Sequence, residues 1–219
     1  MRQVAIRPIG IILFLLLLLL TAYAKDLNSD LYLASYKGDA EAVKALLDSG
    51  ANVNAKNDEG LTALMCAVSI KGNSKIIKML LNKGADVNAR YLDGATALMY
   101  AAREGDAEVV KMLLEKGADV NAKDAEGVTA LMLTVMNEHP GIVETLLEKG
   151  ANVNAKDADG ITVLMRAVIN ENPGIVETLL AHGADVNAKA HNGITALMYA
   201  EKREQVEIVR MLTQAGAKE

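Results

Sequence analysis

The sequence predicts an all-α repeat solenoid of about six helix-turn-helix units, each extended by a β-hairpin finger. A segment resembling GADVNAKDAEGVTALM recurs five times, and its first glycines lie 34, 33, 33 and 33 residues apart: Gly50, Gly84, Gly117, Gly150 and Gly183. A fixed period in this range is typical of stacked repeats. Between the copies, two short apolar patterns of helical spacing alternate with a glycine-containing turn.

The 219-residue chain divides into a leader, residues 1–24, and a repeat domain, residues 25–219. Lys56 and Arg90 each end one of the aligned units. The six units cover about residues 26–56, 57–90, 91–123, 124–156, 157–189 and 190–219. Since no Pro/Gly/Ser-rich linker interrupts them, we expect one domain.

The third unit shows the pattern within each repeat. Thr96 precedes ALMYAARE as an N-cap, where its hydroxyl can accept a bond from a backbone N–H group, and Gly105 ends this first helix. In DAEVVKMLLEK the apolar residues fall on one stripe, which predicts a second, amphipathic helix. Gly117 follows as the left-handed stop, and Gly127 closes the hairpin finger that comes next.

The terminal units carry polar residues in slots that are apolar elsewhere. Asp30 and Ser35 align with alanines of the third unit, while Glu201 replaces an alanine and Thr213 a leucine in the last unit. A solenoid must present polar outer faces at its two ends. We therefore expect these four residues to lie on capping surfaces.

The leader has the features of an export signal. Arg2 and Arg7 precede the start of an uncharged apolar run, Ile9 to Leu20, which is followed by Ala22-Tyr23-Ala24, a small-x-small pattern typical of signal-peptidase sites. The alternative is a retained membrane anchor, but a spanning helix needs about 20 apolar residues. We expect cleavage after Ala24, no stable membrane insertion afterwards, and a periplasmic or secreted protein.

The charge of the mature chain restricts its partners. Residues 1–24 hold two arginines and no acid, so 21 Lys and Arg face 28 Asp and Glu in the rest, a net charge of −7. This balance argues against nucleic acid as a partner. Cys66 is the single cysteine, so no intrachain disulfide can form, and packing must hold the fold together. We expect a monomer.

No motif for catalysis, metal binding or cofactor binding is apparent. His139, His182 and His191 lie near turns or helix ends, without the spacing of a zinc site. Cys66 occupies a slot that is mostly apolar in the other units, which favours a packing role over a nucleophilic one. Phosphate-binding glycine loops and nucleophile motifs are absent. We predict no catalytic, metal or cofactor-binding residue, and hence no enzyme.

The pattern D-x-x-G-x-T-x-L-x-x-A-A, followed by V-x-x-L-L-x-x-G-A-D-V-N-A, resembles ankyrin repeats over about Asp26 to Ala217. Where the family usually has Thr-Pro-Leu-His, this chain has Thr-Ala-Leu-Met, as bacterial-type members often do. The resemblance implies a concave binding face, made of the fingers and the first helices. In-phase slots on this face vary between units while the leucine slot, represented by Leu131, never changes.

The leader implies export, and the resemblance implies a non-catalytic module that binds another protein, as an accessory or as an inhibitor or immunity-type partner of a co-encoded toxin. Drift of exposed residues is the alternative explanation of the variable slots. The alternative function is a small-ligand carrier or an enzyme accessory with an unrecognised active site. The predicted protein-binding residues on the concave face are Tyr36, Ile70, Tyr91, Leu92, Arg103, Met136, Ile169, His191 and Lys202.

Overall fold

The computed structural model describes residues 27–218, so the predicted leader and its cleavage site lie outside the described residues. Residues 27–37 form the helix that precedes α2. The other helices are α2 (Ala40–Asp48), α3 (Ala63–Val68), α4 (Ser74–Asn82), α5 (Ala97–Glu104), α6 (Ala107–Glu115), α7 (Ala130–Met136), α8 (Pro140–Glu148), α9 (Val163–Ile169), α10 (Pro173–Ala181), α11 (Ala196–Lys202) and α12 (Val206–Gln214).

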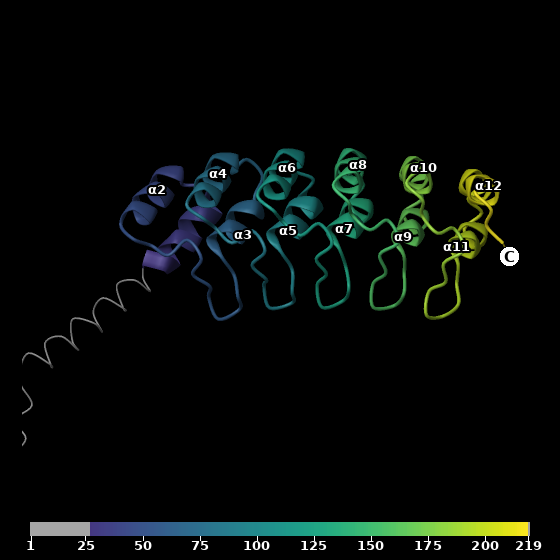
Figure 1. Ribbon diagram of the computed structural model, residues 1–219, viewed down its shortest axis with the longest axis horizontal. Helices are drawn as coiled ribbons and strands as arrows, with labels where there is room; N and C mark the ends of the chain where they lie inside the picture. Colours follow the sequence, from purple (N-terminus) through teal and green to yellow (C-terminus); the bar gives the residue numbers. More distant parts are fainter. Residues whose placement is uncertain (1–26, 219) are drawn as a thin grey trace, which may run out of the picture.

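The helices stack in pairs along one axis, which confirms the all-α repeat solenoid (Figure 1). One row holds the second, outer helices α2, α4, α6, α8, α10 and α12. A parallel row holds the first, inner helices, and the fingers project from the side opposite the outer row. Each inner helix packs on the next, as α5 does on α7 and α7 on α9.

The fourth helix pair, α7 and α8, shows why each unit folds as it does. The Thr129 hydroxyl accepts a bond from the backbone N–H of Met132 at 3.3 Å and so caps α7. Pro140 occupies the first turn of α8, where a missing N–H group costs little. Gly150, with φ +85°, then ends the helix in the left-handed region.

The core runs continuously through the stack because each inner helix packs on its neighbours, and the internal ones are covered on both sides. The unchanged leucine slot is at most 5% exposed in each unit. Its six members are Leu31, Leu64, Leu98, Leu131, Leu164 and Leu197. One helix pair exposes both of its broad faces, so neighbouring pairs must bury them.

A ladder of asparagines joins the loops that follow the outer helices. The Asn121 side-chain amide donates to the Gly150 carbonyl at 3.0 Å, and its oxygen accepts from the Asn152 backbone N–H at 2.8 Å. Each of these asparagines therefore satisfies backbone groups of the following unit. The same pair of bonds is made by Asn54, Asn88, Asn154 and Asn187.

The fingers are tight hairpins that bond to one another. In one finger the Asp124 N–H donates to the Val128 carbonyl at 3.1 Å, and Gly127 turns the chain with φ +76°. Within the described residues the β-structure is limited to isolated bridges, such as Lys156 with Thr162. Backbone bonds also cross between fingers, as from Ala158 N–H to Glu126 O at 2.7 Å.

Two sequence predictions about polar side chains are wrong in detail. Thr96 is the N-cap residue of α5, but its hydroxyl makes no capping bond and lies buried without a partner among the described residues. Ser35 is fully buried and does not contribute to an outer face. The other predicted capping residues, Asp30, Glu201 and Thr213, are exposed as expected.

The position of each slot explains the error at Ser35. The slot shared by Ser35, Ala102 and Glu201 is buried in the first and third units and exposed in the last. It therefore faces the following unit, and no unit within residues 27–218 follows that of Glu201. The slot of Asp30 is exposed in the first unit and buried at Ala196 in the last, so it faces the preceding unit. A slot therefore needs a polar residue only in the terminal unit where it faces solvent and no neighbouring unit covers it.

The buried leucine slot makes a direct prediction about stability. Leu131→Ala should lower the free energy of unfolding by about 2–5 kcal/mol, through lost burial and the cavity left behind. Glu126→Ala, on an exposed finger, should change it by no more than about 0.5 kcal/mol. Chemical denaturation followed by circular dichroism measures both values. Equal midpoints for the two variants would contradict the assignment of the core.

Candidate functional site

The predicted binding residues lie in two groups. One group occupies the ends of the inner helices or the turns that follow: Tyr36, Ile70, Arg103, Met136, Ile169 and Lys202. The other group, Tyr91, Leu92 and His191, lies on the fingers. Most of these side chains are exposed, but Tyr91 and Ile169 are half-buried. The structure therefore places a row of variable residues along the inner helices, with fingers beside it.

Met136 and Ile169 occupy equivalent positions on adjacent helices, α7 and α9. Met136 is 40% exposed, whereas Ile169 packs partly against the core. The Asn170 amide donates to the Met136 carbonyl at 3.0 Å and ties the ends of these two helices together. We call Met136 and Ile169 the apolar patch, in which this bond links the two helix ends and Met136 is the more exposed member.

A small cleft lies beside the patch, and it includes residues that the sequence analysis did not predict. Its volume is about 100 Å³. The Arg103 guanidinium stacks over the ring of Tyr100, 5.1 Å from the ring centroid. Such a contact between a cation and an aromatic ring holds both groups in place. The cleft is lined by Asp93, Ala95, Met99, Tyr100, Arg103, Asp124 and Leu133.

Tyr100 belongs to a slot whose chemistry changes from unit to unit. The slot holds Leu33, Cys66, Tyr100, Leu133, Arg166 and Tyr199. The variation of this slot could have identified it as a binding position. Its place on an inner helix, next to invariant core residues, indicated instead that its side chains are buried. In the structure Tyr100, Leu133, Arg166 and Tyr199 are half-buried. They present part of their surface beside the fingers.

Polar contacts fix the fingers near the cleft. The Tyr91 hydroxyl donates to Glu59 Oε2 of the preceding finger at 2.6 Å, and this hydrogen bond raises the pKa of Tyr91 to about 12. In the same unit as Ile169, Arg166 Nη2 lies 2.5 Å from Oδ2 of the buried Asp157. The other Asp157 oxygen accepts from the Ile161 N–H at 2.9 Å. Both contacts are consistent with a pre-ordered surface.

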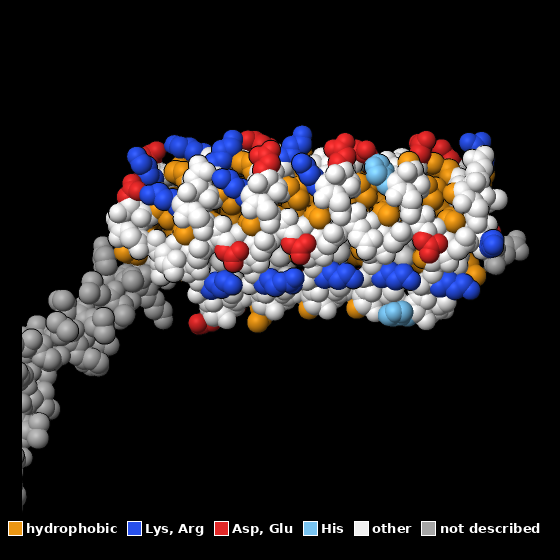
Figure 2. Space-filling view, in the orientation of Figure 1, with side chains coloured by type: hydrophobic (Ala, Val, Ile, Leu, Met, Phe, Trp, Pro, Cys, Tyr) orange, Lys and Arg blue, Asp and Glu red, His pale blue; other side chains and the backbone are white. Residues whose placement is uncertain are grey.

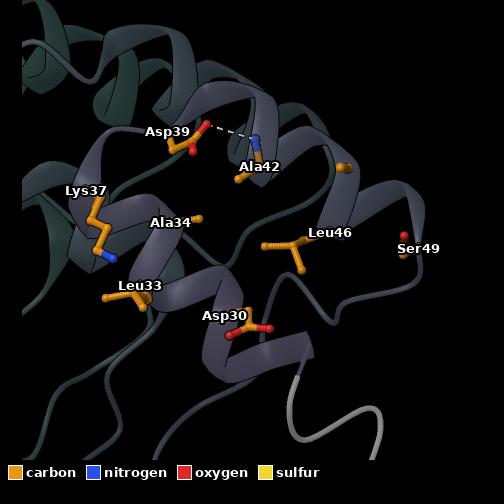
Figure 3. Close-up of a pocket in the computed structure, with 9 residues that line it drawn as sticks. Asp30, Leu33, Ala34, Lys37, Asp39, Ala42, Leu46 and Ser49 are labelled. Atoms are coloured by element: carbon orange, nitrogen blue, oxygen red, sulfur yellow. Dashed lines mark hydrogen bonds between the residues drawn. The ribbon is translucent and has the colours of Figure 1, made fainter.

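A larger hollow than this cleft lies elsewhere, at the N-terminal end of the stack (Figure 3). It has a volume of about 420 Å³. Leu46 there is half-buried, whereas Leu113 in the same slot is completely buried. The hollow is therefore the end face that a preceding unit covers elsewhere. It is lined by Asp30, Leu33, Ala34, Lys37, Asp39, Ala42, Ala45, Leu46 and Ser49.

Residues 27–218 hold neither a cluster of metal ligands nor a helix suited to span a membrane. Within that range no three His, Cys, Asp or Glu side chains gather as metal ligands. Over the same range, none of the helices combines the length and the apolar character needed to cross a membrane. Cys66 is buried in α3, and burial raises the pKa of its thiol to about 11.

The burial of Cys66 predicts slow thiol chemistry. At pH 8 a thiol with a pKa of about 11 is only about 0.1% thiolate, and the thiolate is the reactive form. Iodoacetamide should therefore label the native protein far more slowly than the urea-unfolded protein. Below pH 11 the native rate should rise about tenfold with each pH unit. Mass spectrometry measures the rate, and equal native and unfolded rates would contradict the burial.

The fold and this face together define a helical repeat solenoid with a variable, pre-ordered surface along its inner helices. The family pattern described as ankyrin repeats (3 copies) matches residues 31–124, 90–157 and 131–219. The chain therefore belongs to the ankyrin-repeat family, whose members generally mediate protein–protein interaction. No curated protein matches the chain.

Proposed function

We propose that this protein is an exported, non-catalytic module of six ankyrin units that binds another protein through its concave face. The observation that carries the proposal is the Met136–Ile169 patch beside the Arg103–Tyr100 pair. An apolar centre with a charged rim is the anatomy of a protein interface. Aromatic and arginine side chains are also enriched among the residues that contribute most to binding.

The rigidity of the patch supports a binding role over simple drift of exposed residues. The bond from Asn170 to the Met136 carbonyl and the stacking of Arg103 on Tyr100 hold the surface in one arrangement. A pre-ordered surface loses less conformational entropy when a partner binds. The variable slots would then determine which protein is recognised, and the proposed role is that of an accessory or of an inhibitor or immunity-type partner.

Met136→Glu tests the proposed interface. The change should weaken partner binding at least about tenfold, because a carboxylate would be buried against an apolar surface without a counter-charge. The thermal midpoint should change little, since Met136 is already 40% exposed. Ile169 is left unchanged, because its contact with the core would confuse loss of binding with loss of folding.

The matched control is Val206→Glu, an apolar-to-Glu change at a side chain that is 80% exposed at the start of the outer helix α12. Tagged wild type and both variants would be used to capture partners from the native periplasmic or extracellular fraction. The affinity for a captured protein would then be measured by calorimetry. Unchanged affinity for Met136→Glu, with an unchanged melt, would place the interface elsewhere.

We also propose that residues 1–24 are removed during export. The basis is the charged start, the short apolar run and the Ala22-Tyr23-Ala24 pattern. The mature protein should begin at Lys25, as N-terminal sequencing of protein from its native compartment would show. A membrane-bound species that still begins with Met1 would instead indicate a retained anchor.

A further inference from the structure

A row of basic side chains, none of which belongs to the Met136–Ile169 patch, crosses the fingers (Figure 2). Each follows the Asn-Ala pair at the end of a repeat, and each is exposed. We call this row the basic stripe, and it consists of Lys56, Arg90, Lys123, Lys156 and Lys189. It stands out because the whole chain is acidic, with a net charge of −5.

The central members of the basic stripe are held in position by the neighbouring fingers. The Arg90 guanidinium donates to the Lys123 carbonyl at 2.7 Å. The Lys123 ammonium donates to the Lys156 carbonyl at 2.8 Å, and the Lys156 ammonium donates to the Lys189 carbonyl at 3.2 Å. An ammonium group has three donors, so each lysine keeps two for another acceptor. Long side chains fixed in this way lose less entropy when they bind.

The basic stripe makes no direct salt bridge within the described residues, although acidic side chains lie beside it (Figure 2). Asp119, near the start of the same finger segment, directs Oδ1 to the Asn121 backbone N–H at 2.9 Å. Asp86 and Asp185 make the same local contact. Five cations thus stand in a line with donors to spare.

The spacing of this line suits an extended polypeptide. Stacked helix pairs are about 10 Å apart, so successive members of the basic stripe should have a similar separation. Three residues of an extended or polyproline II chain rise about 9–10 Å. In polyproline II every third side chain also points in the same direction. A carboxylate at every third residue would therefore match one basic residue in each unit.

We propose that the basic stripe binds an extended acidic segment of a protein partner, with carboxylates repeating every third residue. The proposal rests on the proposed function in taking a protein as the occupant, but it concerns a separate surface. Nucleic acid fits less well, because its charges are more closely spaced and continue beyond the stripe.

The test uses two synthetic peptides and the mature chain. The in-register peptide is (Glu-Pro-Ala)4-Glu, and its control has the same composition with the five glutamates contiguous. Fluorescence anisotropy at low ionic strength should show at least about fivefold tighter binding of the in-register peptide. The double variant Lys123→Gln, Lys156→Gln should bind the in-register peptide at least about fivefold more weakly than the wild type does, because two charge contacts are lost. Added salt should weaken the binding.

Two matched variants separate charge from structure. Lys44→Gln combined with Lys111→Gln makes the same charge change on exposed positions of the outer helices, and should alter binding less than about twofold. The double variant Lys123→Arg, Lys156→Arg should keep the wild-type affinity for the in-register peptide, since Arg90 already makes the equivalent contact between fingers. Thermal melts verify that all variants fold.

Equal binding of the two peptides, or an equal loss in the outer-helix variant, would overturn the proposal. Tighter binding of single-stranded DNA with the same number of charges would overturn it in favour of nucleic acid. Met136→Glu should leave peptide binding unchanged. If peptide discrimination fails while Met136-dependent capture of a partner persists, the basic stripe proposal is wrong and the proposed function stands.

Discussion

The structure depends on the burial of each helix pair against its neighbours. Leu131 and Leu164 are almost completely buried, yet neither could be so within an isolated pair, because a pair exposes both broad faces. Stacking supplies the missing cover and also fixes the separation of the units. The arrangement of every surface residue follows from that separation. Met136 and Ile169 are neighbours because α7 and α9 are.

Side-chain hydrogen bonds between units satisfy backbone polar groups for which apolar burial provides no partner. Loops and helix ends at each joint carry backbone groups without partners in their own unit. Asn121 supplies partners at the outer loops, while Asn170 does so where the inner helices end. The Asn170 bond is accepted by the backbone carbonyl of Met136, a residue of the proposed binding patch. The hydrogen bond that satisfies a backbone carbonyl between two units therefore also helps to order the surface available to a partner.

The sequence predicts the repeat, the helix pairs and the leucine core because these depend on a pattern that recurs in phase. It predicts individual exposure less well, since exposure depends on which neighbour a slot faces. Ser35 was placed on the surface because it aligns with an alanine, but its slot faces the following unit. The repeat pattern predicts an exposed Ile169, but this side chain packs partly on the core. Tyr100 was missed because its slot adjoins both the core and the fingers.

The asparagine ladder has a direction, and this affects how such a chain can lengthen. Each asparagine binds the loop of the following unit, as Asn154 binds the Gly183 carbonyl and the Asp185 N–H. The last one, Asn187, does the same for Gly216 and Lys218 near the end of the chain. Duplication of an internal unit would thus create joints identical to those already present. Gene duplication could extend the row of variable slots while the specialised ends stay unaltered.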